Sequence, residues 1–100
     1  FAILCLSTKH SVIAYHEVSR GTLDATLVHP REVFKAALLA NAAAIVLCHN
    51  HPSGEPTPSP DDLQLTRRLV GAGALLGVDV LDHVIVGDGR YYSFKESGCL

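Results

Sequence analysis

Two histidines and a carboxylate stand at spacings that suit a metal ion. His49 and His51 follow directly on an apolar run that ends at Cys48. Residues two apart on an extended chain point to the same side, so the two imidazoles would face together. Asp62 follows a proline-rich stretch that would bring it back near the end of that run. Two imidazoles and one carboxylate are a normal ligand set for a catalytic zinc ion with a fourth position left to water.

Ser59 stands three residues before Asp62 and could present its hydroxyl to such a water or to a substrate oxyanion. Each part of the pattern also has a structural interpretation. Ser59-x-x-Asp62 is close to a capping box, and a His-x-His pair is often only exposed or hydrogen-bonded. The combination favours a metal site, because His-x-His, a seven-residue rigid spacer and Ser-x-x-Asp follow one apolar run in that order.

The elements that must position these residues alternate between strands and helices. Short apolar or alternating runs, separated by Gly and Pro clusters, predict strands at 1–6, 12–18, a short third strand within 22–29, 43–48, 78–86 and 91–94. Pro30 predicts the first turn of a helix over about 31–41. Ser59 as N-cap predicts a second helix that ends near Gly77. The order predicts one α/β domain over residues 1–100, with a sheet flanked by helices.

Composition limits the other possibilities. A chain of 100 residues with 48% hydrophobic and 18% charged residues is one globular domain. Its formal net charge of -2 gives no basic footprint for direct nucleic-acid binding. The longest clean apolar run, 42–48, is far too short to span a bilayer. Three cysteines without metal or disulfide spacing favour reduced thiols and a cytoplasmic location. Because the chain begins with Phe1, we expect a fragment of a longer protein.

The string from His49 to Asp62, His-x-His-x7-Ser-x-x-Asp, resembles the JAMM signature of the JAB/MPN metallohydrolases. Further segments are similar to the RadC branch of that family: His49-Asn50-His51-Pro52-Ser53-Gly54, Pro58-Ser59, Pro30-Arg31-Glu32 and Leu81-Asp82-His83. The similarity covers essentially the whole chain, in the expected order.

The resemblance implies a fold, a site and an activity. The fold would be the three-layer, cytidine-deaminase-like α/β arrangement of a JAB/MPN domain. His49, His51 and Asp62 would bind one Zn²⁺ per chain. Ser59 would steady the zinc-bound water or the tetrahedral intermediate. Zinc would activate that water and polarise a carbonyl, and the activity would be metalloprotease-like hydrolysis of a peptide or isopeptide amide.

The resemblance also implies a glutamate as general base. In RadC-type sequences it stands just before a Phe that resembles Phe1, so we expect it upstream of this chain. Glu17 and Glu32 are the alternatives within the chain. Glu17 is more typical of a solvated strand residue, and Glu32 of a residue that the helix dipole favours.

Asp82 and His83 form a further candidate pair, which could orient a metal ligand from behind. His83 could equally be an ordinary buried histidine with its hydrogen bonds satisfied. Two other functions stay open. One is a non-catalytic interaction module that keeps the fold, although the complete ligand set favours an enzyme. The other is a DNA-repair accessory, which the family's historical name suggests and the charge balance does not support.

Overall fold

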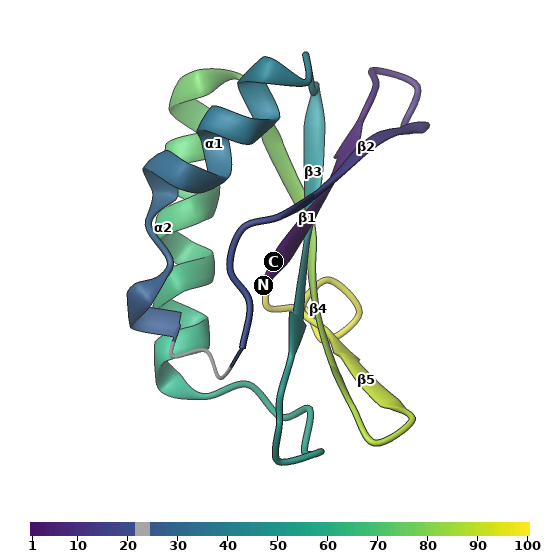
Figure 1. The fold of residues 1–100 in the computed structure, drawn as a ribbon, viewed down its shortest axis with the longest axis vertical. Helices are drawn as coiled ribbons and strands as arrows, with labels where there is room; N and C mark the ends of the chain where they lie inside the picture. The colour runs from purple at the N-terminus through teal and green to yellow at the C-terminus, as the bar shows by residue number, and fades with distance from the viewer. Residues whose placement is uncertain (22–24) are drawn as a thin grey trace.

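A computed structural model describes residues 1–21 and 25–100 of the chain. Within those residues it shows one mixed sheet of five strands with two α-helices packed on it (Figure 1). The elements are β1 (Ala2–Leu6), β2 (Val12–Glu17), a 3₁₀ turn (Ala25–Leu27), α1 (Pro30–Leu39), β3 (Ala44–Asn50), α2 (Pro60–Leu76), β4 (Asp79–Gly87) and β5 (Arg90–Ser93). The predicted α/β class is confirmed.

The sheet has the order β2-β1-β3-β4-β5, so β3 lies at its centre. This strand pairs antiparallel with β1 and parallel with β4. Parallel neighbours need a crossover connection, and α2 supplies it. The segment between β3 and α2 therefore leaves the sheet at the carboxyl end of its central strand, which is where open α/β sheets commonly bind ligands.

One face of the sheet carries the core. Ile45 and Leu47 of β3 are fully buried, whereas Val46 between them is only half-buried. Such alternation is expected when a sheet is covered on one side. The core cluster joins that face to the two helices and includes Ile3, Cys5, Val33, Phe34, Ala37, Ile45, Leu47, Leu65, Leu69 and Val78.

Both helices lie on the same face of the sheet (Figure 1). The described residues therefore form two layers, and the third layer that the resemblance implied is not seen among them. The β1–β2 and β4–β5 hairpins are too short to carry a helix, so the α-helices of the described residues lie in the β2–β3 and β3–β4 connections.

Local sequence signals set the helix ends. Pro30 occupies the first turn of α1, where the His29 ring accepts the backbone N–H of Arg31. Ser59 caps α2, and Gly77 ends it with a left-handed φ of 74°. Both predicted helices are confirmed to within two residues at each end. In the described part of the chain, neither helix has the length and apolarity that a bilayer crossing requires.

Two strand predictions need correction. The third strand within 22–29 is wrong for residues 25–27, which form a 3₁₀ turn, while residues 22–24 lie outside the described residues. Ala25 and Val28 are buried and Leu27 is exposed, which is the three-residue spacing of a 3₁₀ turn rather than strand alternation. The other correction concerns β3, which continues to Asn50 and so contains His49.

Candidate metal centre

The end of β3 and the start of α2 bring His49, His51 and Asp62 together. Each offers one ligand atom, and these atoms all lie within 4.8 Å of one another. His49 and Asp62 are almost fully buried, and His51 is partly buried. The three residues that the sequence predicts as metal ligands are therefore neighbours in space.

The distances between these side chains suit a small cation. Nδ1 of His49 lies 3.4 Å from Oδ1 of Asp62, and Nε2 of His51 lies 3.0 Å from Oδ2. Ligand atoms around a tetrahedral zinc lie about 3.3 Å apart when the bonds measure about 2.0–2.1 Å. The two His–Asp separations are already close to this spacing, while the widest separation in the cluster, up to 4.8 Å, would have to shorten for three protein ligands to hold one ion.

The ring of His51 is held so that its Nε2 faces Asp62, an arrangement that a cation between them would stabilise. Its Nδ1 lies 2.8 Å from the carbonyl oxygen of Glu55. A carbonyl only accepts, so Nδ1 must carry the proton. In a neutral ring Nε2 then directs a lone pair at the Asp62 carboxylate, which also only accepts when ionised. A proton or a metal ion must lie between those two atoms, and imidazole with carboxylate suits zinc.

Asp62 is held in its ionised form by the capping box of α2. The Ser59 N–H donates to Oδ2 of Asp62 at 2.8 Å, and the Asp62 N–H donates to Oγ of Ser59 at 3.1 Å. Burial opposes ionisation, but the bonds from Ser59 and the neighbouring histidines outweigh it, and the pKa of Asp62 lies below its usual value. The capping box and the metal site use the same side chains, so the two sequence interpretations are compatible.

His49 occupies an aromatic environment. Its ring centroid lies 5.5 Å from that of Phe1 and 4.8 Å from that of His51. Burial lowers its pKa, which favours the neutral form that binds metals. Both ring nitrogens are buried, and neither has a hydrogen-bond partner among the described residues. Buried polar atoms are normally paired, so these nitrogens are consistent with a site that binds a ligand.

Comparison with known proteins identifies the family of this chain. The model of the RadC-like JAB domain matches residues 1–99. The chain belongs to the RadC-like JAB domain family. It is 55% identical to a UPF0758 protein of Alkaliphilus metalliredigens over 100 residues, which are all of this chain and 43% of that protein. It is 56% identical to a UPF0758 protein of Symbiobacterium thermophilum over 100 residues, again 43% of the relative. A Methanosarcina barkeri relative is 52% identical over 98 residues, or 98% of this chain and 43% of that protein. The chain thus spans less than half of the relatives it matches.

Asp82 and His83, the second predicted pair of this RadC-like domain, lie on opposite faces of β4. Asp82 accepts hydrogen bonds from the Ser93 hydroxyl and from the Lys95 N–H, on the face away from the helices. His83 lies on the helix face, fully buried, with its ring 5.9 Å from that of His49. Burial and the neighbouring His49 lower the pKa of His83 to about 4. Of the two, only His83 lies beside the metal-ligand cluster.

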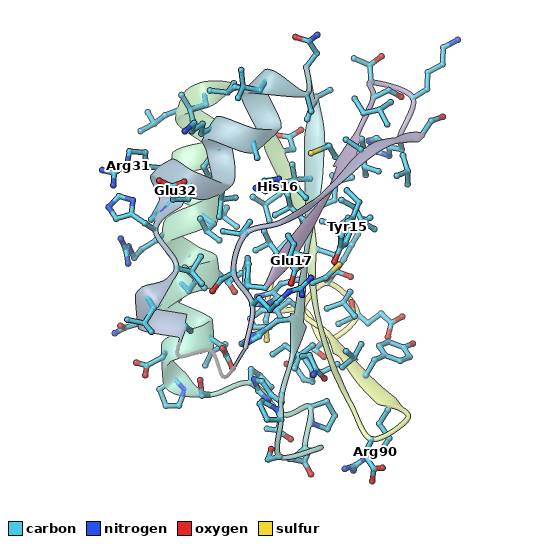
Figure 2. All side chains as sticks on the ribbon, in the orientation of Figure 1. Tyr15, His16, Glu17, Arg31, Glu32 and Arg90 are labelled. Atoms are coloured by element: carbon cyan, nitrogen blue, oxygen red, sulfur yellow. The ribbon has the colours of Figure 1, made fainter. Side chains whose placement is uncertain are left out.

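A cleft of about 300 Å³ opens beside His49. Its lining includes Phe1, Tyr15, Glu17, Cys48, His49 and Asn50. Glu17 reaches it from the end of β2 and is paired with Arg20 at 2.9 Å, which lowers the pKa of this carboxyl. Glu32 lies with Arg31 on the outer side of α1 (Figure 2). Of the two alternative bases, only Glu17 shares a cleft with His49.

Two parts of the site were not predicted from the sequence. The Glu55 carbonyl that orients His51 belongs to the backbone, so no pattern of side chains in the sequence predicts it. Thr66 is one helical turn beyond Asp62, and its hydroxyl contacts both the Asp62 carbonyl and the His83 ring. Its position four residues after a candidate ligand is a signal that could have found it.

A close backbone contact sets the position of the His51 loop. A Cβ added to Gly87, at the end of β4, would lie 2.7 Å from the carbonyl carbon and oxygen of Gly54. The same loop is joined to β4 by the bond from the His51 N–H to the Val86 carbonyl. Because the backbones of β4 and of the loop are in contact there, neither segment can move away without a cost in free energy.

We expect Gly87→Ala to displace this loop and with it His51. The cost should be about 1–3 kcal/mol of unfolding free energy, as for other overpacked sites. Zinc affinity should fall about tenfold or more, as when a ligand loses its supporting partner. Competition with a chromophoric chelator measures the affinity. Gly71→Ala, where the added Cβ meets nothing within 4 Å, is the control. Unchanged affinity in Gly87→Ala would show that the contact does not position His51.

Proposed function

We propose that this domain is a zinc-dependent hydrolase of the JAMM metalloprotease type, acting on a peptide or isopeptide amide. The observation that carries the proposal is the arrangement of His51, whose Nε2 faces Asp62 while its Nδ1 is committed to a carbonyl. A metal ion resolves that conflict, and His49 completes the set of three protein ligands. When bound in such a site, zinc lowers the pKa of its water towards neutrality and polarises a carbonyl.

Ser59 is well placed to assist. Its Oγ accepts the Asp62 N–H at 3.1 Å, so the hydroxyl proton stays available for another acceptor. Ser59 is partly exposed and adjoins the ligand cluster. We propose that it donates this proton to the oxygen on which negative charge develops during attack on the amide, which is the usual role of an oxyanion donor.

We propose that the general base comes from a glutamate upstream of Phe1. The Phe1 ring packs against His49, so a residue that precedes β1 would enter beside the ligand cluster. Glu17 is the alternative, since it shares the cleft with His49. The cleft beside His49 would then receive the substrate chain.

The three free cysteines support a cytoplasmic location.

Metal content and hydrolysis test the proposal. Elemental mass spectrometry of the domain should find about one zinc per chain. The natural full-length protein should hydrolyse a peptide or isopeptide library in a chelator-sensitive way. If no metal is bound even after zinc is supplied, the interaction-module function takes its place. A protein that binds zinc and hydrolyses no amide would retain the site and contradict the enzyme.

We expect Ser59→Ala to separate catalysis from metal binding. In the full-length protein the variant should keep its zinc and lose about 100-fold or more in kcat, as enzymes do without an oxyanion donor. It should also lose about 1 kcal/mol of stability with the helix cap. Ser59→Thr, which keeps the hydroxyl and the cap, should retain much of both. Full activity in Ser59→Ala would remove Ser59 from the reaction.

A further inference from the structure

Behind His49 lies a second buried histidine that the proposed reaction does not use. His83 is on β4 opposite Leu47 of β3, two residues along the strand from His49 and on the same face. Its ring lies nearly parallel to that of Phe94, with centroids 4.6 Å apart, and 5.8 Å from that of Phe1. This packing fixes the plane of the His83 ring.

A hydroxyl on α2 fixes where the proton of His83 lies. Oγ1 of Thr66 is 2.8 Å from the carbonyl oxygen of Asp62 and 2.7 Å from Nδ1 of His83. The carbonyl can only accept, so the single hydroxyl proton must point to it. The hydroxyl oxygen then accepts from His83, and Nδ1 must be the donor. His83 therefore carries its proton on Nδ1 and a lone pair on Nε2.

Both histidines are left with an incomplete hydrogen-bond set. Nε2 of His83 is buried without a partner among the described residues, as are the two ring nitrogens of His49. On His49, Nδ1 lies 3.4 Å from Oδ1 of Asp62, so Nδ1 is the nitrogen on the side of the metal-ligand cluster. A metal-bound histidine usually donates its other N–H to a fixed acceptor. For His49 that donor would be Nε2.

We propose that Thr66 and His83 form a positioning pair for His49, in which the lone pair of His83 Nε2 accepts the N–H of His49 Nε2 through one bridging water. This inference rests on the proposed metal site and extends it to a tautomer. The Thr66 hydroxyl holds the proton of His83 on Nδ1, His83 holds the proton of His49 on Nε2, and Nδ1 of His49 is thereby left free to bind the metal.

The same hydroxyl connects the pair to the second ligand. Thr66 donates to the carbonyl of Asp62 one helical turn before it. His49 on β3 and Asp62 on α2 come from different layers of the fold, and the Thr66–His83 contact joins those layers directly. The pair therefore sets both the tautomer of one ligand and the distance between two of them. His83 and Thr66 are positioning residues, since neither would touch substrate.

Nitrogen-15 NMR of the histidine rings tests the tautomers without any measurement of activity. In the metal-free domain His83 should show a protonated Nδ1 and an unprotonated Nε2. In the zinc-loaded domain His49 should be bound through Nδ1 and carry its proton on Nε2. A His83 ring protonated on Nε2, or a His49 bound through Nε2, would overturn the inference while leaving zinc binding itself intact.

Two substitutions at Thr66 provide a second, independent measurement. Thr66→Val keeps the shape and removes the hydroxyl, so we expect the His83 tautomer signals to change and zinc affinity to fall about 10–100-fold. Thr66→Ser restores the hydroxyl and should restore the wild-type spectrum and most of the affinity. Thr8→Val, in the exposed β1–β2 turn, is the control. Wild-type tautomers and affinity in folded Thr66→Val would reject the pair, whereas absence of zinc from the wild-type protein would reject the metal site instead.

Discussion

Replacement of Asp62 with alanine is expected to abolish stoichiometric zinc binding. The change removes the only carboxylate of the ligand cluster and leaves His49 and His51 as two isolated imidazoles. Loss of a residue that merely supports a ligand costs about 10–100-fold in metal affinity, so loss of the ligand itself should exceed that range. Elemental mass spectrometry after dialysis against trace zinc is the measurement.

Asp62 also caps a helix, and a second variant separates its two roles. In Asp62→Ala the backbone N–H of Ser59 loses its acceptor, which should cost about 1 kcal/mol of stability. Asp62→Asn keeps a side-chain oxygen for that N–H but lacks the charge that zinc prefers. We expect Asp62→Asn to stay close to wild type in stability and still to bind zinc weakly. Stoichiometric zinc in Asp62→Ala would show that the ligand assignment is wrong.

Most of the fold follows from local sequence patterns. Pro30, Ser59 and Gly77 are terminal signals with a stereochemical basis, and each lies where the structure begins or ends a helix. The cluster of His49, His51 and Asp62 was also predictable, because the end of one strand and the first turn of the next helix come together when the loop between them is short and rigid. Metal chemistry needs few residue types, so such a pattern is specific.

The remaining features depend on tertiary context. Residues 25–27 were predicted as part of a strand, but the chain forms a 3₁₀ turn there, with Ala25 and Val28 packed in the core. Asp82 and His83 are neighbours in sequence but face opposite sides of the sheet. They were predicted as a pair because they are adjacent, yet only His83 lies beside the candidate site. The protonation pattern of His83 depends on Thr66, 17 residues earlier in the chain.

The position of Asp62 depends on how α2 packs against the sheet. Gly73, near the C-terminal end of α2, allows the helix to approach the start of β4 closely. Gly73 is buried where the chain passes Gly77 and turns back into β4. A Cβ at Gly73 would lie 2.3 Å from the carbonyl oxygen of Val78 and 3.3 Å from the ring of Phe34. The Val78 N–H in turn donates to the Gly73 carbonyl at 2.9 Å. Only a residue without a side chain permits this crossing.

Gly73→Ala is therefore expected to have the largest effect on stability. Overpacking commonly costs about 1–3 kcal/mol, and the cost here should reach or exceed the upper end, because backbone rather than a flexible side chain must move. For a domain of this size that corresponds to a Tm lower by about 10 °C or more. Gly71→Ala, two residues earlier on the exposed side of the same helix, should instead gain up to about 1 kcal/mol from helix propensity. Thermal unfolding of the two variants compares the same chemical change with opposite expected signs. If both raised the Tm, the close approach of α2 to the start of β4 could not be what fixes the helix, and with it Asp62, on the sheet.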